Sequence, residues 1–209
     1  MKFEHSKENG TITFRGGVGE YDDYISADAF ITALDEMDGD ITINLDSSGG
    51  SVTDGLSIYN AIRQYDRGVV NVHIDAMCAS IATVIACSAT GKVIMNSNAK
   101  YMIHRAWTAA MGNCKDFRSM ADIMELMDMD IAETYQARAG GDVDEWLAMM
   151  DAETWMDANK ALELGLVDEI YDVREKKVKA EESLPDVKAF VSPNRIMAKV
   201  IEAMHRYSK

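Results

Sequence analysis

Four features of this sequence could together carry out acyl transfer. They are the Gly49–Gly50 pair, Ser80 in the segment MCASIAT, His104 in KYMIHRAW, and a carboxylate near Glu153. A serine hydroxyl is a weak nucleophile, and histidine is the side chain best suited to accept its proton at neutral pH. A carboxylate can fix the histidine tautomer and stabilise the imidazolium. The combination predicts a nucleophilic serine site.

The same chemistry needs backbone N–H groups that hold the oxyanion of a tetrahedral intermediate. A Gly-Gly turn offers such a donor with no Cβ in the way, and the residue after the nucleophile offers a second. Each residue alone also has an ordinary interpretation. Ser80 could be a small helix residue bonded to a carbonyl, His104 a half-buried histidine, and Glu153 a helix cap or surface acid. Their joint occurrence in these local contexts favours catalysis.

The elements that must position these residues alternate between strands and helices. Alternating and apolar runs predict strands at 11–19, 40–46 and 69–75, with two more inside 92–107. Helical spacing predicts helices at 26–37, 52–65 and 79–89. This order indicates an α/β fold with a largely parallel sheet. The candidate residues fall beside the strand ends, where such sheets place their sites.

The second half of the sequence is more helical. A long helix is expected at 116–138, followed by a helix at 143–151 and by a capped helix, a glycine stop and a strand within 157–173. The long helix carries an apolar stripe that suits core packing or an oligomer interface: Met120, Ile123, Met124, Met127 and Ile131. Residues 1–173 are expected to form one domain. A charged linker and a short amphipathic helix are expected in 174–209.

Composition excludes several classes of protein. The 209 residues suffice for one sizeable domain, and the net charge of −14 argues against nucleic-acid binding and against an anionic membrane surface. The sequence has no secretory signal and no apolar run near the length of a membrane span, so a cytoplasmic location is expected. Three cysteines without a CxxC pair predict reduced thiols and no metal site. ATGK (89–92) and GGVG (16–19) do not complete a nucleotide-binding motif, so no cofactor is expected.

Four segments together resemble the ClpP family of serine peptidases, within the crotonase-like superfamily. INLDSSGGSVTDGLSIYNAI is similar to the strand, Gly-Gly turn and helix of that family, and DAMCASIATVIACSA is similar to its nucleophile segment. KYMIHRAW is similar to the histidine segment, and ETWMDANKALELGLVDEI to the last segment. The resemblance covers roughly residues 11 to 172.

The resemblance implies a role for each site residue. Ser80 would be the nucleophile, His104 the base and Glu153 the acid, with Gly50 and Ile81 forming the oxyanion hole. Glu153 stands where the family has aspartate, and Asp151 is a rival for the same role. The implied fold is a ClpP/crotonase-like spiral of repeated ββα units with the helix at 116–138 protruding as a handle. That handle would pair rings of a homo-oligomer back to back.

Other positions depart from the family and narrow the implied function. Ser48 stands where proline usually precedes the glycines, Ala76 and Ala82 replace glycines, and Ala106 replaces a proline. This combination is most similar to the ClpP-related head maturation proteases of tailed phages and prophages, which cleave scaffold and capsid proteins. The expected location is then the bacterial cytoplasm or the phage prohead. The short segment before the first strand argues against a Clp-type ATPase partner.

Two alternatives share this fold. A crotonase-type acyl-CoA enzyme would have acidic catalytic residues and a CoA pocket. A ring-forming assembly protein would have the oligomer without a reactive serine.

Overall fold

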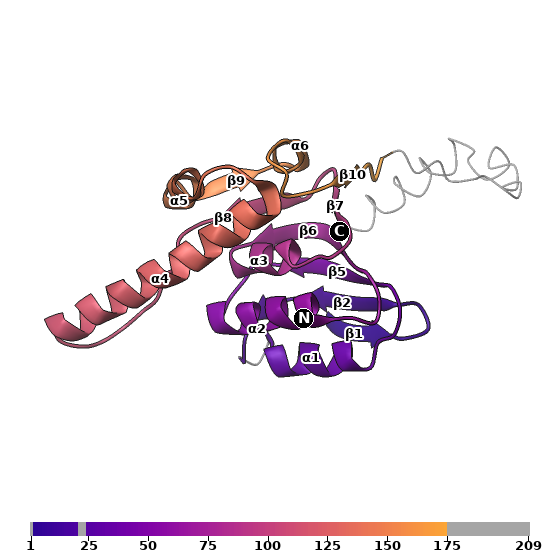
Figure 1. Cartoon of the computed structure of the whole chain (residues 1–209), viewed down its shortest axis with the longest axis horizontal. Helices are drawn as coiled ribbons and strands as arrows, with labels where there is room; N and C mark the ends of the chain where they lie inside the picture. Colours follow the sequence, from indigo (N-terminus) through magenta and orange to yellow (C-terminus); the bar gives the residue numbers. More distant parts are fainter. Residues whose placement is uncertain (1, 21–23, 175–209) are drawn as a thin grey trace, which may run out of the picture. The chain divides into compact units, whose positions relative to one another are not determined.

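Eight strands form one mixed sheet in the computed structural model of this chain (Figure 1). The structure describes residues 2–20 and 24–174, which belong to a compact unit spanning Met1–Arg174. Neighbouring strands follow the order β1 (Lys2–Ser6), β2 (Thr11–Arg15), β5 (Ile41–Ser47), β6 (Val70–Ala79), β7 (Val93–Asn96) and β10 (Glu169–Tyr171), and β8 (Lys100–Ile103) and β9 (Thr154–Met156) branch from β6. All these pairs are parallel except β1 with β2 and β8 with β9. The predicted α/β class with a largely parallel sheet is confirmed.

Three helices pack on one face of this sheet: α1 (Ala27–Asp35), α2 (Val52–Gln64) and α3 (Ile81–Cys87) (Figure 1). Serine caps start two of them, because Ser26 accepts the N–H of Ala29 and Ser51 accepts the N–H of Asp54. The later helices are α4 (Cys114–Ala139), α5 (Val143–Asp151) and α6 (Ala158–Glu163). Figure 1 shows α4 extending well beyond the sheet, as expected for the predicted handle.

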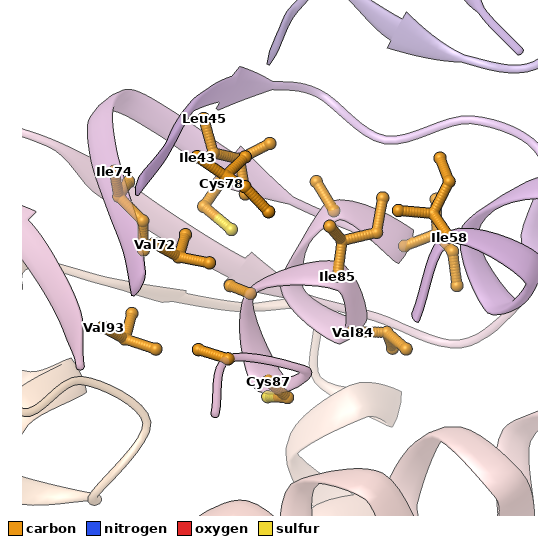
Figure 2. Packing of buried hydrophobic residues seen from close by; sticks show 14 of the residues in the cluster. Ile43, Leu45, Ile58, Val72, Ile74, Cys78, Val84, Ile85, Cys87 and Val93 are labelled. Carbon is orange, nitrogen blue, oxygen red and sulfur yellow. The ribbon is translucent and has the colours of Figure 1, made fainter. Parts of the chain in front are cut away.

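The core lies between the sheet and the helices α1, α2 and α3 (Figure 2). Every second residue of β5 is buried, and the same alternation runs through the first part of β6. Their side chains meet apolar residues of α2 and α3, with Ile58, Val84 and Ile85 fully buried. Because α3 is buried at all seven of its positions, the segment that follows Ser80 is held rigidly.

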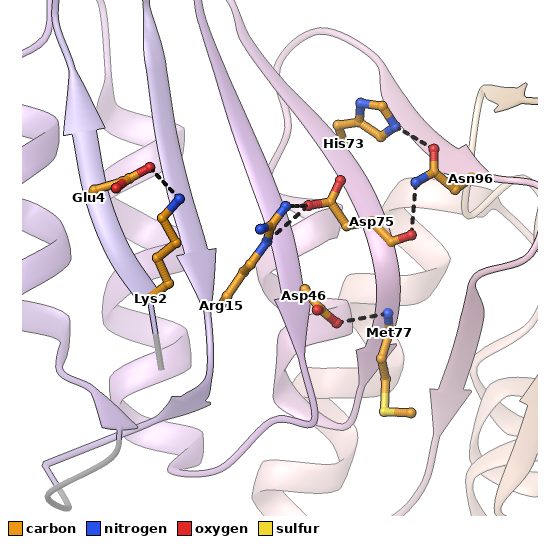
Figure 3. Close-up of polar contacts among 8 residues, drawn as sticks. All are labelled: Lys2, Glu4, Arg15, Asp46, His73, Asp75, Met77 and Asn96. Carbon is orange, nitrogen blue, oxygen red and sulfur yellow. Dashed lines mark hydrogen bonds and ion pairs between the residues drawn. The ribbon is translucent and has the colours of Figure 1, made fainter. Parts of the chain in front are cut away.

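The opposite face of the sheet is polar (Figure 3). Arg15 of β2 donates two hydrogen bonds to Asp75 of β6, and Asn96 of β7 donates to the main-chain oxygen of Asp75. His73 shares a hydrogen bond with Asn96 at 2.8 Å. These contacts cross four neighbouring strands and hold them in register on the face that no core helix covers.

The elements differ from the sequence predictions mainly in length. β6 continues to Ala79, four residues beyond the expected end, because its second part leaves β7 and pairs with β8 instead. β1 and β9 were not expected. The charged residues of β1 hide its half-buried Phe3, and β9 is too short to produce a periodic pattern.

Several expectations concern other properties of the chain. The linker and amphipathic helix expected in 174–209 lie outside the described residues, apart from Arg174. No helix within residues 2–20 and 24–174 combines the length and hydropathy needed to cross a bilayer. The three cysteines are free, and burial raises the pKa of Cys87 to about 12.

Candidate active site

Ser80 occupies the junction between β6 and α3 in a strained backbone conformation. Its φ of 58° lies in the left-handed region, which non-glycine residues rarely adopt. The backbone is held on both sides, because Ser80 N–H donates to the Met102 carbonyl and the Ser80 carbonyl accepts the Thr83 N–H, each at 2.9 Å. Such strain costs of order 1–3 kcal/mol and is typical of functional sites.

The Ser80 hydroxyl points to His104 and does not cap its own helix. A serine at this position would ordinarily accept an N–H from the first turn of the helix, but Ser80 makes no side-chain cap. Ser80 Oγ lies 2.8 Å from His104 Nε2. His104 directly follows β8, and β8 pairs with the end of β6 that carries Ser80. The two residues, which are distant in sequence, therefore meet at the carboxyl ends of neighbouring parallel strands.

The Gly49–Gly50 turn packs directly against Ser80. A Cβ on Gly49 would lie 2.5 Å from the Ser80 Cβ, and one on Gly50 would lie 2.1 Å from the Val18 carbonyl oxygen. Val18 of β3 (Gly17–Val18) fixes the turn, because its N–H donates to the Gly49 carbonyl and its carbonyl accepts the Ser51 N–H. The Gly50 N–H makes no hydrogen bond to any described residue. Ile81 is the first residue of α3, so its N–H has no acceptor within the helix.

An irregularity in the sheet brings the glycine turn and the serine to the same level. Leu45 pairs with Ile74, but Ser47 pairs with Cys78, so three residues of β6 lie opposite one residue of β5. The Asp46 side chain accepts the N–H of Met77 in this irregular stretch, at 3.1 Å (Figure 3). Bulges of this kind often occur beside active sites, where they redirect the strand.

Ser80 and His104 open into a cleft of about 860 Å³. The glycine turn and Ile81 line it near the serine, and the 104–109 segment lines another part. The apolar stripe of α4 forms a further wall, with Met120, Ile123, Met124, Met127 and Ile131 facing the cleft. None of the described residues that line this cleft is acidic. That composition disfavours the acyl-CoA alternative, which predicted acidic catalytic residues.

Neither candidate acid is hydrogen-bonded to His104 in the described part of the chain. Glu153 accepts a hydrogen bond from Trp155 Nε1 at 3.1 Å, and it has a left-handed φ of 47°. Asp151 is held by Arg105, which donates to both of its carboxylate oxygens at 2.8 and 3.0 Å. This pairing with Arg105 keeps the pKa of Asp151 below its ordinary value.

A buried carboxylate holds the segment that follows His104. Asp128 of α4 is 5% exposed and accepts the N–H of Ala106 at 2.7 Å. Its other oxygen accepts a hydrogen bond from Arg105, which also binds Asp151. Arg105 thereby links α4 to α5 beside the histidine, and the main chain at 105–106 is fixed to the handle helix.

A serine and a histidine in hydrogen-bonding contact beside a glycine turn, within a mixed α/β fold, form the arrangement expected of an enzyme with a nucleophilic serine. Comparison with protein families matches residues 14–174 to the family described as Clp protease. This chain belongs to the Clp protease family.

Its relatives agree with that assignment. The chain is 31% identical to the ATP-dependent Clp protease proteolytic subunit 1 of Leifsonia xyli subsp. xyli, over 70% of this chain and 74% of the relative. It is 29% identical to proteolytic subunit 2 of Tropheryma whipplei, over 70% and 81%. A solved structure of a ClpP1 mutant from Listeria monocytogenes superposes with a TM-score of 0.69, at 22% identity, over 80% of this chain and 94% of that one. This superposition supports the ClpP-like fold.

Sequence reasoning named the residues that meet at the cleft but missed some that hold them. The structure brings together Ser80, His104, Gly50 and Ile81, whereas the Glu153 carboxylate is hydrogen-bonded to Trp155 and not to His104. One of the missed residues, whose main chain bonds a turn more than thirty residues away, is Val18 in GGVG. The glycines that follow an alternating strand were the available signal for a tight turn there. Nothing in the sequence indicated Thr83 or Tyr135, whose hydroxyls meet under Ser80.

Proposed function

We propose that this protein is a ClpP-type serine endopeptidase. The observation that carries the proposal is the 2.8 Å contact between Ser80 Oγ and His104 Nε2 at an open cleft. Ser80 attacks the peptide carbonyl while His104 accepts its proton, with the other imidazole proton on Nδ1. The N–H groups of Gly50 and Ile81 hold the oxyanion. His104 returns the proton to the leaving amine, and water then hydrolyses the acyl-enzyme.

Labelling with a fluorophosphonate, followed by peptide mapping, tests this function directly. We expect covalent modification at Ser80, because among the described serines only Ser80 has its hydroxyl in hydrogen-bonding contact with a histidine. Absence of label at Ser80 would contradict the proposal and would favour the ring-forming assembly protein. Binding of a CoA thioester without labelling would favour the acyl-CoA enzyme instead.

We propose Glu153 as the acid on the basis of strand register. β8 and β9 are antiparallel with Ile103 opposite Thr154, so the next position along each strand places His104 opposite Glu153. The strained φ of Glu153 also fits a functional position. Its carboxylate would have to leave the Trp155 indole to reach Nδ1 of the imidazole. Asp151 is engaged by Arg105, which makes it the weaker candidate.

Amide substitutions separate the two acids. We expect Glu153→Gln to lower kcat by about 10²-fold or more, because the imidazolium loses its stabilising charge. Asp151→Asn is expected to change kcat by less than about threefold, since it removes a largely exposed ion pair. Steady-state hydrolysis of a peptide measures both. The reverse order of effects would assign the role to Asp151, and two small effects would indicate a Ser–His dyad.

We propose that the protein acts on other proteins as a homo-oligomer of stacked rings. Its α4 helix exposes large apolar side chains, with Leu126 67% and Phe117 49% exposed, which fits an interface. The curated relatives are named as ATP-dependent subunits. For this chain we propose activity that is independent of ATP or assisted by a chaperone. The sequence departures at Ser48, Ala82 and Ala106 support phage scaffold and capsid proteins as substrates.

A further inference from the structure

A chain of buried hydroxyl groups runs from the handle helix to the main chain of Ser80. Tyr135 of α4 places its Oη 2.6 Å from Thr83 Oγ1, and Thr83 Oγ1 lies 2.5 Å from the Ser80 carbonyl oxygen. Tyr101 of β8 donates to the Thr83 carbonyl at 3.2 Å. Thr83, Tyr101 and Tyr135 are at most 1% exposed, so water does not compete for these hydrogen bonds.

The direction of each hydrogen bond follows from the number of protons. A threonine hydroxyl has one proton, and a carbonyl oxygen can only accept. Thr83 therefore donates to the Ser80 carbonyl, and Tyr135 must donate to Thr83. Burial raises the pKa of Tyr135, so its phenol keeps the proton that this arrangement requires. The two hydrogen bonds are therefore donated in one direction, from Tyr135 of α4 to Thr83 and from Thr83 to the Ser80 carbonyl.

This series of hydrogen bonds ends at Ser80, whose backbone conformation is strained. The Ser80 carbonyl accepts from both the N–H and the hydroxyl of Thr83, while its N–H is bound by Met102. A backbone with φ of 58° persists only where its surroundings hold it. The hydroxyl of Thr83 is one of those restraints, and Tyr135 fixes the orientation of that hydroxyl.

We infer that Thr83 and Tyr135 are positioning residues, which hold the Ser80 main chain so that its Oγ meets His104 and which couple α4 to the nucleophile. This inference rests on the proposed function. Neither hydroxyl touches the reacting atoms, because both act through the Ser80 carbonyl. One turn after Tyr135, α4 is also held to the sheet. Arg138 of α4 binds Asp168, and Asp168 accepts the N–H of Val93 in β7.

Three substitutions test the inference through the reactivity of Ser80. Thr83→Val and Tyr135→Phe each remove a hydroxyl with little change in volume. Each is expected to lower kcat, and the second-order rate of fluorophosphonate labelling, by about tenfold with KM within about twofold. Thr83→Ser keeps the hydroxyl and is expected to remain within about threefold of wild type. The double variant Thr83→Val/Tyr135→Phe is expected to be no slower than the slower single variant, because both break one chain.

Tyr65→Phe is the matched control. Tyr65 is 8% exposed and donates to the Gly39 carbonyl at 2.8 Å, so the change removes a comparable hydroxyl that has no link to Ser80. Its labelling rate should equal that of wild type. Thermal unfolding of each variant shows whether the fold persists. If Thr83→Val does not fold, Tyr135→Phe and Thr83→Ser still decide.

The outcomes distinguish failure of this inference from failure of the proposed function on which it rests. A wild-type protein that does not label at Ser80 overturns the proposed function and the inference together. A wild type that labels, with folded Thr83→Val and Tyr135→Phe variants that label equally fast, overturns the inference alone. Equal slowing in Tyr65→Phe would also overturn it, because the effect would then be one of general stability.

Discussion

Replacing Ser80 by alanine is expected to lower kcat for hydrolysis of an unfolded protein such as casein by about 10⁴-fold or more. The substitution removes the atom proposed to attack the carbonyl, and among the described residues only the Ser80 hydroxyl is hydrogen-bonded to His104. Alanine fits the space, since only the hydroxyl is lost. Circular dichroism and size-exclusion chromatography should therefore match the wild type.

The same measurement with His104→Ala tests whether the two side chains work as a unit. We expect a loss of similar size, and the double variant Ser80→Ala/His104→Ala should be no worse than Ser80→Ala, because each change disables one proton transfer. Ser88→Ala is a suitable control, since Ser88 is buried in the same segment and, among the described residues, its hydroxyl bonds only the Ile85 carbonyl. Retained casein turnover in Ser80→Ala would contradict the proposed nucleophile.

The positions of Ser80 and His104 could be foreseen because strand ends can be read from local sequence. Apolar runs with period two mark the strands, and the residues that follow parallel strands gather at one edge of the sheet. The predicted, largely parallel sheet and the predicted long helix are both present in the structure. Boundaries were less accurate: β6 runs to Ala79 because it exchanges one partner strand for another, which no local pattern reports.

Other parts of the site depend on contacts between distant segments. Val18 clamps the glycine turn across more than thirty residues of chain, and Tyr135 reaches Thr83 from a helix 52 residues away. The acid proposed to act with Ser80 and His104 also depends on contacts that local sequence does not report. Sequence position named Glu153, yet the orientation of its side chain depends on the neighbouring Trp155, whose indole competes for the carboxylate. Such choices are set by tertiary packing rather than by residue type.

Gly49→Ala should lower kcat severely, although it adds a single methyl group. The new Cβ would lie 2.5 Å from the Ser80 Cβ and 2.7 Å from the Ala79 carbonyl oxygen, so the turn or the serine must move. The φ of 91° at Gly49 adds strain for any other residue. Displacing the turn also displaces the Gly50 N–H proposed for the oxyanion. Loss of one such donor costs about 10²–10³-fold, so we expect kcat to fall by about 10³-fold.

Gly39→Ala separates the steric effect of the added Cβ from the effect of backbone strain at a positive φ. Gly39 also has a positive φ, 69°, but a Cβ there would meet no atom within 4 Å. We expect Gly39→Ala to lower the free energy of unfolding by about 1 kcal/mol and to leave kcat within about twofold of wild type. Peptide hydrolysis and chemical denaturation of both variants make the comparison. If Gly49→Ala retained kcat as fully as Gly39→Ala, close packing of the glycine turn on Ser80 could not be what holds the oxyanion donors in place.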